Sequence, residues 1–329
     1  MDIFLKRVIL FILSWSFLSA AMAWQPRAII VFGDSISDNG NKYKLYHIPV
    51  SPPYWHGRYS NGPVWTEILA YRLNLIKDPQ KNPNYPRTEL FQDYAFGQSV
   101  VLESNLSPRD KTKTLLAQVN EYLKQAPSAN LQNTLVILWD GANDFKAPHC
   151  INDPFACVKE MIHLHSRIVM SLYDKGIRHF LFLTIPNVTI TPEAQFGLDD
   201  RGRQEIAELI KYYNHSLIQS VEYLNFLKED AHFMISDSNI FIENAKHNFS
   251  NPFKLACYDN KGIYDRTMGT ICPEDTQANY FFWDWTHTTE TVHHLLADHI
   301  YEQLQLLPWE DKPSPQPEVQ KTTTEAPID

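Results

Sequence analysis

A serine that could act as a nucleophile lies in the string Gly33-Asp34-Ser35, directly after a short apolar run. Ligands of open α/β sheets bind beyond the carboxyl ends of the strands, so a tight turn there would present the Ser35 hydroxyl to the binding crevice. If a helix follows directly, its N-terminal N–H groups would also favour a developing anion. Gly-Asp-Ser is equally an ordinary turn sequence. Ser35 is therefore a candidate nucleophile that needs partners elsewhere in the chain.

A base for this serine could come from Asp284-Trp285-Thr286-His287, near the other end of the chain. A serine hydroxyl is a poor nucleophile at neutral pH and needs a neighbouring base. A histidine three residues after an aspartate can receive the carboxylate at one ring nitrogen, and the other nitrogen is then available for the proton of Ser35. The competing interpretation is that Asp284 caps a helix starting near Thr288 and that His287 is a surface residue.

Two glycine-containing segments would supply donors to an oxyanion. Asn143 lies in Gly141-Ala142-Asn143-Asp144, directly after the clearest strand pattern of the chain (TLVILW), and its side-chain N–H groups could donate to an oxyanion. Gly97 follows Tyr94-Ala95-Phe96. Its backbone N–H would be a second donor, and the missing side chain would allow a close approach of the substrate. Each segment alone is explained as well by a simple turn.

The elements that must position these residues alternate along the chain. Apolar runs predict strands at 28–32, 91–96, 134–139, 179–185 and 232–236. Helical spacing predicts helices at 64–75, 112–125, 158–173, 204–227 and 289–306. Strands that are apolar throughout, alternating with helices, are typical of a parallel sheet covered on both faces. Two stretches, 41–63 and 246–279, are expected to form long surface loops.

The ends of the chain differ in composition from its middle. Lys6 and Arg7 precede an apolar run, and Ala21-Met22-Ala23 is a cleavage pattern, so residues 1–23 are predicted to be a signal peptide. The run is too short for a membrane anchor, the alternative reading. We expect a secreted or periplasmic protein with one catalytic domain over residues 24–308. Residues 309–329, rich in Pro, Glu, Lys and Thr, are expected to be disordered.

The composition and the net charge limit the classes of partner that the chain is expected to bind. The hydrophobic fraction is 44% and the charged fraction is 20%, as in ordinary globular proteins. The net charge is −9 and no dense Lys/Arg cluster occurs, which argues against nucleic acid as a partner and against purely electrostatic docking on anionic lipid. No metal or cofactor is expected, because the histidines lack HExxH-type spacing.

Four cysteines, Cys150, Cys157, Cys257 and Cys272, follow the predicted signal peptide. An even number of cysteines in an exported chain favours two disulfides. Proximity along the chain favours Cys150–Cys157 and Cys257–Cys272, although four cysteines allow three connectivities.

Taken together, these segments resemble the four sequence blocks of the GDSL lipases, or SGNH hydrolases. The string from Val31 to Asn41 (VFGDSISDNGN) resembles the first block, and Gly97 falls where the family has its second-block glycine. Gly141 to Asp144 matches the third block (G-x-N-D), and Asp284 to His287 matches the fourth (D-x-x-H). The blocks occur in the family's order and extend across nearly the whole predicted mature chain.

The resemblance implies a three-layer α/β/α fold and hydrolysis of acyl esters without a metal. It implies that Ser35 is the nucleophile, His287 the general base and Asp284 its orienting carboxylate. The oxyanion hole would consist of the backbone N–H groups of Ser35 and Gly97 and the side chain of Asn143.

Several residues depart from the family pattern or point to one of its branches. Ile36 replaces the usual Leu, Gln98 replaces a frequent second glycine, and Thr288 replaces a frequent Pro. The segment from Gly57 to Trp65 (GRYSNGPVW) resembles the larger members of the family, which include bacterial phospholipases and glycerophospholipid–cholesterol acyltransferases.

A lipid ester is therefore the expected substrate. The chain is expected to be a lysophospholipase A or phospholipase A with transient membrane-surface contact, and with acyl transfer to an acceptor alcohol as a further activity. An aromatic set could line the acyl groove, and plain core packing is the alternative that explains most aromatic residues: Tyr54, Trp55, Tyr280, Phe281, Phe282, Trp283 and Trp285. The alternatives are a carbohydrate or aryl esterase on the same fold and a non-enzymatic secreted binding protein.

The segment between Cys257 and Cys272 ends twelve residues before Asp284 and carries both apolar side chains and the exposed-loop features Lys261-Gly262 and Arg266. We expect it to act as a tethered lid that a processing protease can cut. A structural staple without a gating role explains the same features.

Overall fold

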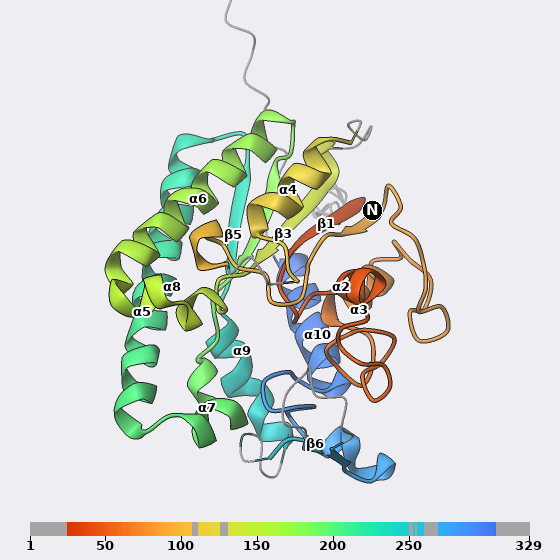
Figure 1. Cartoon of the computed structure of the whole chain (residues 1–329). Coiled ribbons are helices and arrows are strands. Elements are labelled where there is room, and N and C mark those ends of the chain that lie inside the picture. Colours follow the sequence, from red (N-terminus) through yellow and green to blue (C-terminus); the bar gives the residue numbers. More distant parts are fainter. Residues whose placement is uncertain are drawn as a thin grey trace, which may run out of the picture.

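The computed structural model of the chain describes residues 25–106, 111–125, 131–249, 253, 255–259 and 269–306 (Figure 1). The predicted signal peptide and the predicted tail lie outside the described residues. Residues 260–268, which hold most of the predicted lid and its protease sites, also lie outside them. Among the described residues, no helix combines the length and the apolar character needed to cross a bilayer.

A parallel five-stranded sheet in the order β2-β1-β3-β4-β5 forms the centre of the described residues. All five predicted strands are present, with β2 ending three residues earlier than expected. Their bounds are β1 Ala28–Gly33, β2 Phe91–Asp93, β3 Thr134–Trp139, β4 His179–Leu183 and β5 His232–Ser236.

Helices cover both faces of this sheet, which confirms the expected α/β/α layers. In Figure 1, α4, α6 and α8 lie on one side of the strands, and α3 and α10 lie on the other. The helices are α2 Asn41–Tyr46, α3 Trp65–Arg72, α4 Leu115–Leu123, α5 Pro148–Asn152, α6 Pro154–Asp174, α7 Pro192–Gly197, α8 Asp200–Leu227, α9 Ser238–Ala245 and α10 Glu290–Leu306. Short 3₁₀ turns include η3 (Asp144–Lys146), η4 (Val188–Ile190) and η6 (Glu274–Asn279).

The strands divide their apolar side chains between two cores. Successive side chains of a strand point to opposite faces, so Ile30 and Phe32 of β1 enter the core beneath α4, α6 and α8. Ile29 and Val31 enter the core beneath α3, α9 and α10. Because both faces are buried, the strands have no polar alternation, which is the pattern that made them recognisable in the sequence.

The stretches expected to be loops contain short elements. Helix α2 lies in the first, where the Asp38 carboxylate accepts from the N–H groups of Asn41 and Lys42 at 2.6 and 3.2 Å. No helix directly follows Ser35, so the condition for helix N–H groups next to it is not met; residues 34–38 form a turn closed on the Asp34 carbonyl. The second stretch contains the hairpin β6 (Tyr258–Asp259) and β7 (Thr270–Ile271). Such elements are too short for periodicity to reveal.

Strand register brings the candidate residues to one edge of the sheet. Gly33 of β1 pairs with Trp139 of β3, and Val31 pairs with Asp93 of β2. The chain therefore leaves β1 and β3 at the same level and β2 two residues earlier, and the turns that carry Ser35, Gly97 and Asn143 follow at this one edge.

Both expected disulfides are present, Cys150–Cys157 and Cys257–Cys272. The first joins α5 to α6. The second closes the base of the β6–β7 hairpin, where Tyr258 packs against Trp283 and Tyr54.

Candidate active site

Ser35, His287 and Asp284 form a continuous chain of hydrogen bonds. The Ser35 Oγ lies 2.9 Å from the Nε2 of His287, and the Nδ1 of His287 lies 2.8 Å from the Oδ2 of Asp284. An ionised carboxylate only accepts hydrogen bonds, so Nδ1 carries the ring proton and Nε2 is left to accept from the Ser35 hydroxyl. All three residues are buried. The helix-cap alternative for Asp284 does not hold, because α10 begins only at Glu290.

Asp284 is held by more than the histidine. Tyr54 donates its hydroxyl to the Oδ2 of Asp284 at 2.5 Å, and the backbone N–H groups of Thr286 and His287 donate to Oδ1. Burial alone would raise the pKa of Asp284, but the charge of His287 and the hydrogen bonds from His287 and Tyr54 lower it below its ordinary value. The carboxylate therefore stays ionised, as an orienting group for His287 must.

Gln118 of α4 fixes the end of β1, just before Ser35. Its amide Oε1 accepts from the Gly33 N–H at 3.0 Å, and its Nε2 donates to the Gly33 carbonyl at 2.9 Å. The same Nε2 donates to the Ser99 Oγ at 2.8 Å. This fully buried side chain ties the turn that carries Ser35 to the turn after β2.

Asn143 reaches the site from the end of β3. Its Nδ2 donates to the Ser99 carbonyl at 2.9 Å, and the Ser99 hydroxyl donates to Asp140 at 2.6 Å. Asn143 is half-buried and lines the same cavity as Ser35 and His287. An amide nitrogen has two N–H groups, so one anchors the side chain on Ser99 and the other is the group that can face a substrate.

Gly97 is not brought to the cavity. Its N–H donates to the Oδ2 of Asp38 at 2.8 Å, and it is not among the residues that line the cavity. The buried Asp38 carboxylate takes this N–H as one of its backbone partners, so the N–H is already engaged. A Cβ at Gly97 would lie 2.2 Å from the Tyr59 hydroxyl, so close packing on Tyr59 is enough to require a glycine here.

Buried carboxylates anchor the turns of this edge. Burial raises the pKa of Asp34 to about 6, against the opposing effects of the Ile36 N–H and the charge of His287. Burial likewise raises the pKa of Asp144 to about 6, although Asp144 accepts from the N–H groups of Val101 and Leu102 at 2.8 and 3.0 Å. Asp34 accepts from the Ile36 N–H within its own turn, whereas Asp144 of the G-x-N-D block accepts from the segment after β2, which gives Asp144 a positioning role.

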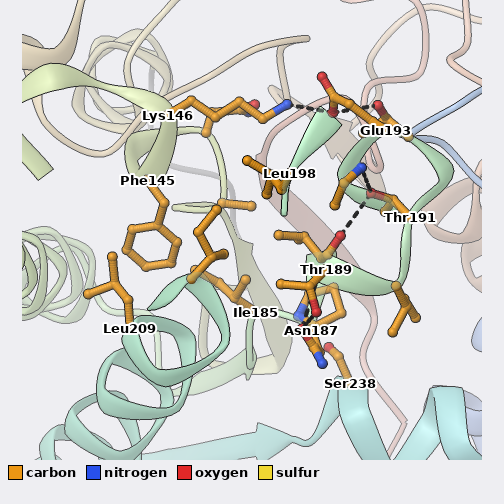
Figure 2. A pocket seen from close by; sticks show the side chains of 18 of the residues that line it. Phe145, Lys146, Ile185, Asn187, Thr189, Thr191, Glu193, Leu198, Leu209 and Ser238 are labelled. Atoms are coloured by element: carbon orange, nitrogen blue, oxygen red, sulfur yellow. Dashed lines mark hydrogen bonds and ion pairs between the residues drawn. The ribbon is translucent and has the colours of Figure 1, made fainter. Parts of the chain in front are cut away.

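A cavity of about 1100 Å³ opens beside Ser35 and His287. Figure 2 shows Phe145, Ile185 and Leu209 gathered along one wall, with Leu198 facing them and the Lys146–Glu193 ion pair at one end. Further apolar lining comes from both sides of the sheet: Ile151, Phe155, Val188, Ile206, Tyr212, Phe241, Ile242, Val292 and Leu296. A cavity of this size and character can hold an aliphatic chain.

Most of the aromatic residues expected to line an acyl groove do not line this cavity. Phe281 and Phe282 line it, whereas the other five are not among its lining residues. Tyr54 and Trp283 belong to a small buried cluster with Cys257 and Tyr258. The expectation was wrong for the five residues because neither nearness in sequence to His287 nor, for Tyr54 and Trp55, a place in a long loop sets the direction of a side chain.

Sequence reasoning missed Gln118, Lys146 and Glu193, and it gave Tyr54 the wrong role. Lys146 follows the G-x-N-D block by two residues, so its proximity to Asn143 was a usable signal. No local signal marks Gln118 or Glu193, because their contacts with the site cross 85 and 93 residues of sequence.

Comparison with known proteins identifies the family. Residues 29–300 match the family described as GDSL-like Lipase/Acylhydrolase. The chain is 24% identical to the thermolabile hemolysin of Vibrio parahaemolyticus, over 88% of this chain and 66% of that protein. It is 24% identical to a phosphatidylcholine-sterol acyltransferase of Aeromonas hydrophila, over 82% of this chain and 88% of that protein. It is also 24% identical to a GDSL esterase/lipase of Arabidopsis thaliana, over 83% and 86% of the two chains.

The family match covers most of the chain and includes every segment that forms the site. Ester hydrolysis or acyl transfer is therefore the class of reaction to which the site belongs. The chain is a member of the GDSL-like lipase/acylhydrolase family.

Proposed function

We propose that the chain is a secreted or periplasmic serine hydrolase that cleaves acyl esters of lysophospholipids or phospholipids. The observation that carries this proposal is the hydrogen-bonded chain Ser35–His287–Asp284 opening onto a large apolar cavity. Export is supported by the two disulfides and by the leader-like sequence up to Ala23, whose removal remains a prediction.

The reaction runs through an acyl-enzyme. Ser35 Oγ attacks the ester carbonyl while His287 Nε2 takes its proton, and His287 then gives that proton to the departing alcohol. Water, activated by the same nitrogen, attacks the acyl-Ser35 ester and releases the fatty acid. Asp284 remains ionised throughout and stabilises the imidazolium form of His287.

The oxyanion donors in this proposal are the backbone N–H of Ser35 and the second Nδ2 hydrogen of Asn143. The first hydrogen of that amide is directed at Ser99, which fixes the plane of the amide before substrate binds. Such preorganised donors stabilise the developing charge without reorganising at the moment of reaction. Gly97 is left out of the donor set, since its N–H already donates to Asp38.

A long acyl chain fits the cavity better than a short one. The apolar lining extends from Ile185 near the sheet to Ile151 and Phe155 at the surface, much further than an acetyl group can reach. Two relatives carry names that refer to lysis of cells and to a phospholipid acyl donor, which supports a lipid ester as substrate.

Comparing esters of one alcohol that differ in acyl length tests the substrate class. We expect kcat/KM to rise from acetyl to palmitoyl esters of the same alcohol, because each added methylene enters the apolar cavity. A preference for acetyl esters would instead favour the carbohydrate or aryl esterase alternative. Inertness toward all esters and toward a serine-directed phosphonate would favour the binding-protein alternative.

Product analysis decides between hydrolysis and acyl transfer. Purified protein is incubated with phosphatidylcholine vesicles, with and without cholesterol, and the lipid products are separated. Free fatty acid in both mixtures supports a hydrolase, and cholesteryl ester in the second supports transfer to an acceptor alcohol.

A further inference from the structure

An ion pair stands at the mouth of the cavity, beside the proposed catalytic residues. Lys146 Nζ lies 2.8 Å from the Oε2 of Glu193, and Figure 2 shows the pair above the apolar wall. The Lys146 and Glu193 side chains are 59% and 49% exposed, and both residues line the cavity. Both charges are therefore accessible to a ligand that enters it.

Each charged residue lies close to a proposed catalytic residue, through the chain for Lys146 and through hydrogen bonds for Glu193. Lys146 ends η3, three residues after Asn143. Thr286, the neighbour of His287, donates its hydroxyl to the Oε2 of Glu193 at 3.0 Å, and the Glu193 N–H donates to the Trp285 carbonyl at 2.9 Å. A group bound by this pair would lie next to an ester carbonyl at Ser35.

An aromatic pair lies next to Glu193, just outside the residues that line the cavity: Phe196 follows Glu193 by three residues on α7, and the Trp285 carbonyl accepts the Glu193 N–H. The ring centroids of Phe196 and Trp285 are 5.5 Å apart, and Phe196 is 69% exposed. Trp285 Nε1 donates to Asp259 at 3.0 Å, which fixes the indole. Aromatic faces next to a carboxylate are the surroundings that bind quaternary ammonium groups.

We propose that Lys146, Glu193 and the Phe196–Trp285 pair form a head-group site for a zwitterionic phospholipid of the phosphocholine type. This inference rests on the proposed function, whose substrate class it narrows. Lys146 binds the phosphate, and Glu193 with the aromatic pair binds the ammonium group.

The charges of the site match such a ligand. A zwitterionic head group can bind both members of the ion pair. An anionic head group is repelled by Glu193, and a neutral glyceride interacts with neither charge. Burial would raise the pKa of Glu193, but Lys146 and the hydrogen bonds from Lys146 and Thr286 lower it, so the carboxylate is ionised. An exposed ion pair contributes little free energy to stability, so Lys146 and Glu193 can separate at little cost and each can bind the ligand instead.

Head-group preference is tested with octanoyl esters below their micelle-forming concentrations. We expect kcat/KM for octanoyl-lysophosphatidylcholine to exceed that for 1-octanoylglycerol by about tenfold, the factor of one charge-assisted hydrogen bond. Lys146→Met should abolish most of this preference. Glu193→Gln should raise kcat/KM for octanoyl-lysophosphatidylglycerol relative to kcat/KM for octanoyl-lysophosphatidylcholine, because the substitution removes the charge that repels an anionic head group.

Lys81→Met is the matched control, since Lys81 forms an exposed ion pair with Asp78 at 3.1 Å and does not line the cavity. It should keep the wild-type preference. If Lys146→Met lowered kcat/KM equally for all three substrates, the head-group site would be overturned. Such a result would mean that Lys146 affects the reaction at the ester and not the binding of the head group.

Binding of a non-hydrolysable ligand tests the site without relying on catalysis. Dodecylphosphocholine and dodecyl maltoside have the same chain, and calorimetry below their micelle-forming concentrations gives both Kd values. Lys146→Met should weaken dodecylphosphocholine binding by about tenfold and leave the maltoside value as it is. An unchanged Kd for dodecylphosphocholine would overturn the inference. Failure of all ester hydrolysis with this binding intact would instead count against the proposed function.

Discussion

The two sides of the active site are held in different ways. On the nucleophile side, Ser35 and Asn143 follow neighbouring strands. Buried Gln118 binds the backbone of Gly33 before Ser35, and buried Asp144, next to Asn143, binds the backbone N–H groups of Val101 and Leu102. On the base side, Asp284 and His287 lie in a loop before α10. Besides the bond between His287 and Ser35, Asp284 accepts a hydrogen bond from the hydroxyl of Tyr54, which lies 230 residues away in the sequence.

The difference indicates two kinds of support. The nucleophile side is part of the sheet edge, so its supporting groups also stabilise the fold. The base side is packed by aromatic rings such as Tyr59, whose ring centroid lies 4.8 Å from that of His287, and Tyr54 adds one hydrogen bond to the carboxylate. Supporting residues on the first side should affect stability together with activity, and Tyr54 should affect mainly the pH dependence.

Removing the nucleophile should have the largest effect. Ser35→Ala keeps a small side chain at a buried turn, so the fold should persist, while kcat falls by a factor on the order of 10⁶, as for other serine hydrolases. Steady-state hydrolysis of a soluble ester, with circular dichroism as the folding control, measures this. Turnover close to wild type in folded protein would remove Ser35 from its proposed role.

Asn143→Ala should come next. An oxyanion donor acts mainly in the transition state, so kcat should fall by about 10²–10³ with little change in KM. The variant also loses the bond to Ser99, so its melting temperature should be measured alongside. A rise in KM alone would make Asn143 a residue that binds the ground state.

Gln118→Leu should combine a loss of stability with a moderate loss of activity. Each buried polar group left without its partner costs about 1–3 kcal/mol, and here the Gly33 N–H and the Ser99 hydroxyl are affected. A shift in the Ser35 turn should lower kcat by about tenfold. Chemical denaturation and kinetics measure both effects. Wild-type values of both would mean that the Gln118 hydrogen bonds do not position this edge.

Tyr54→Phe should have the smallest effect at neutral pH. The ring stays packed on Tyr258, but Asp284 loses one hydrogen bond that favours its ionised form, so the pKa of Asp284 rises. The acidic limb of the kcat/KM profile should therefore move to higher pH, with little change in melting temperature. The carboxylates of Asp34 and Glu193 and the buried His293 also face His287, and all three remain in the variant. An unmoved acidic limb would assign Tyr54 a packing role only.

The same contrast explains how much the sequence could predict. Ser35 and Asn143 were identifiable because each follows an apolar strand, and parallel strands of one sheet end at one edge. The pairing of Asp284 with His287 was identifiable because it is local. Gln118 and Tyr54 were not assigned these contacts, because each depends on how distant segments pack, which no periodicity encodes. For Gly97 the position was identifiable but the direction of its N–H was not, since it depends on Asp38 across 59 residues.

Covalent labelling tests the central claim most directly. A long-chain alkyl phosphonate that mimics the tetrahedral intermediate is incubated with the protein, and the tryptic peptides are analysed by mass spectrometry. If Ser35 is the nucleophile activated by His287, the phosphonyl group is found on Ser35 within peptide 28–42, and His287→Ala slows labelling strongly. A phosphonyl group on another serine, or no adduct on folded protein, would contradict the account.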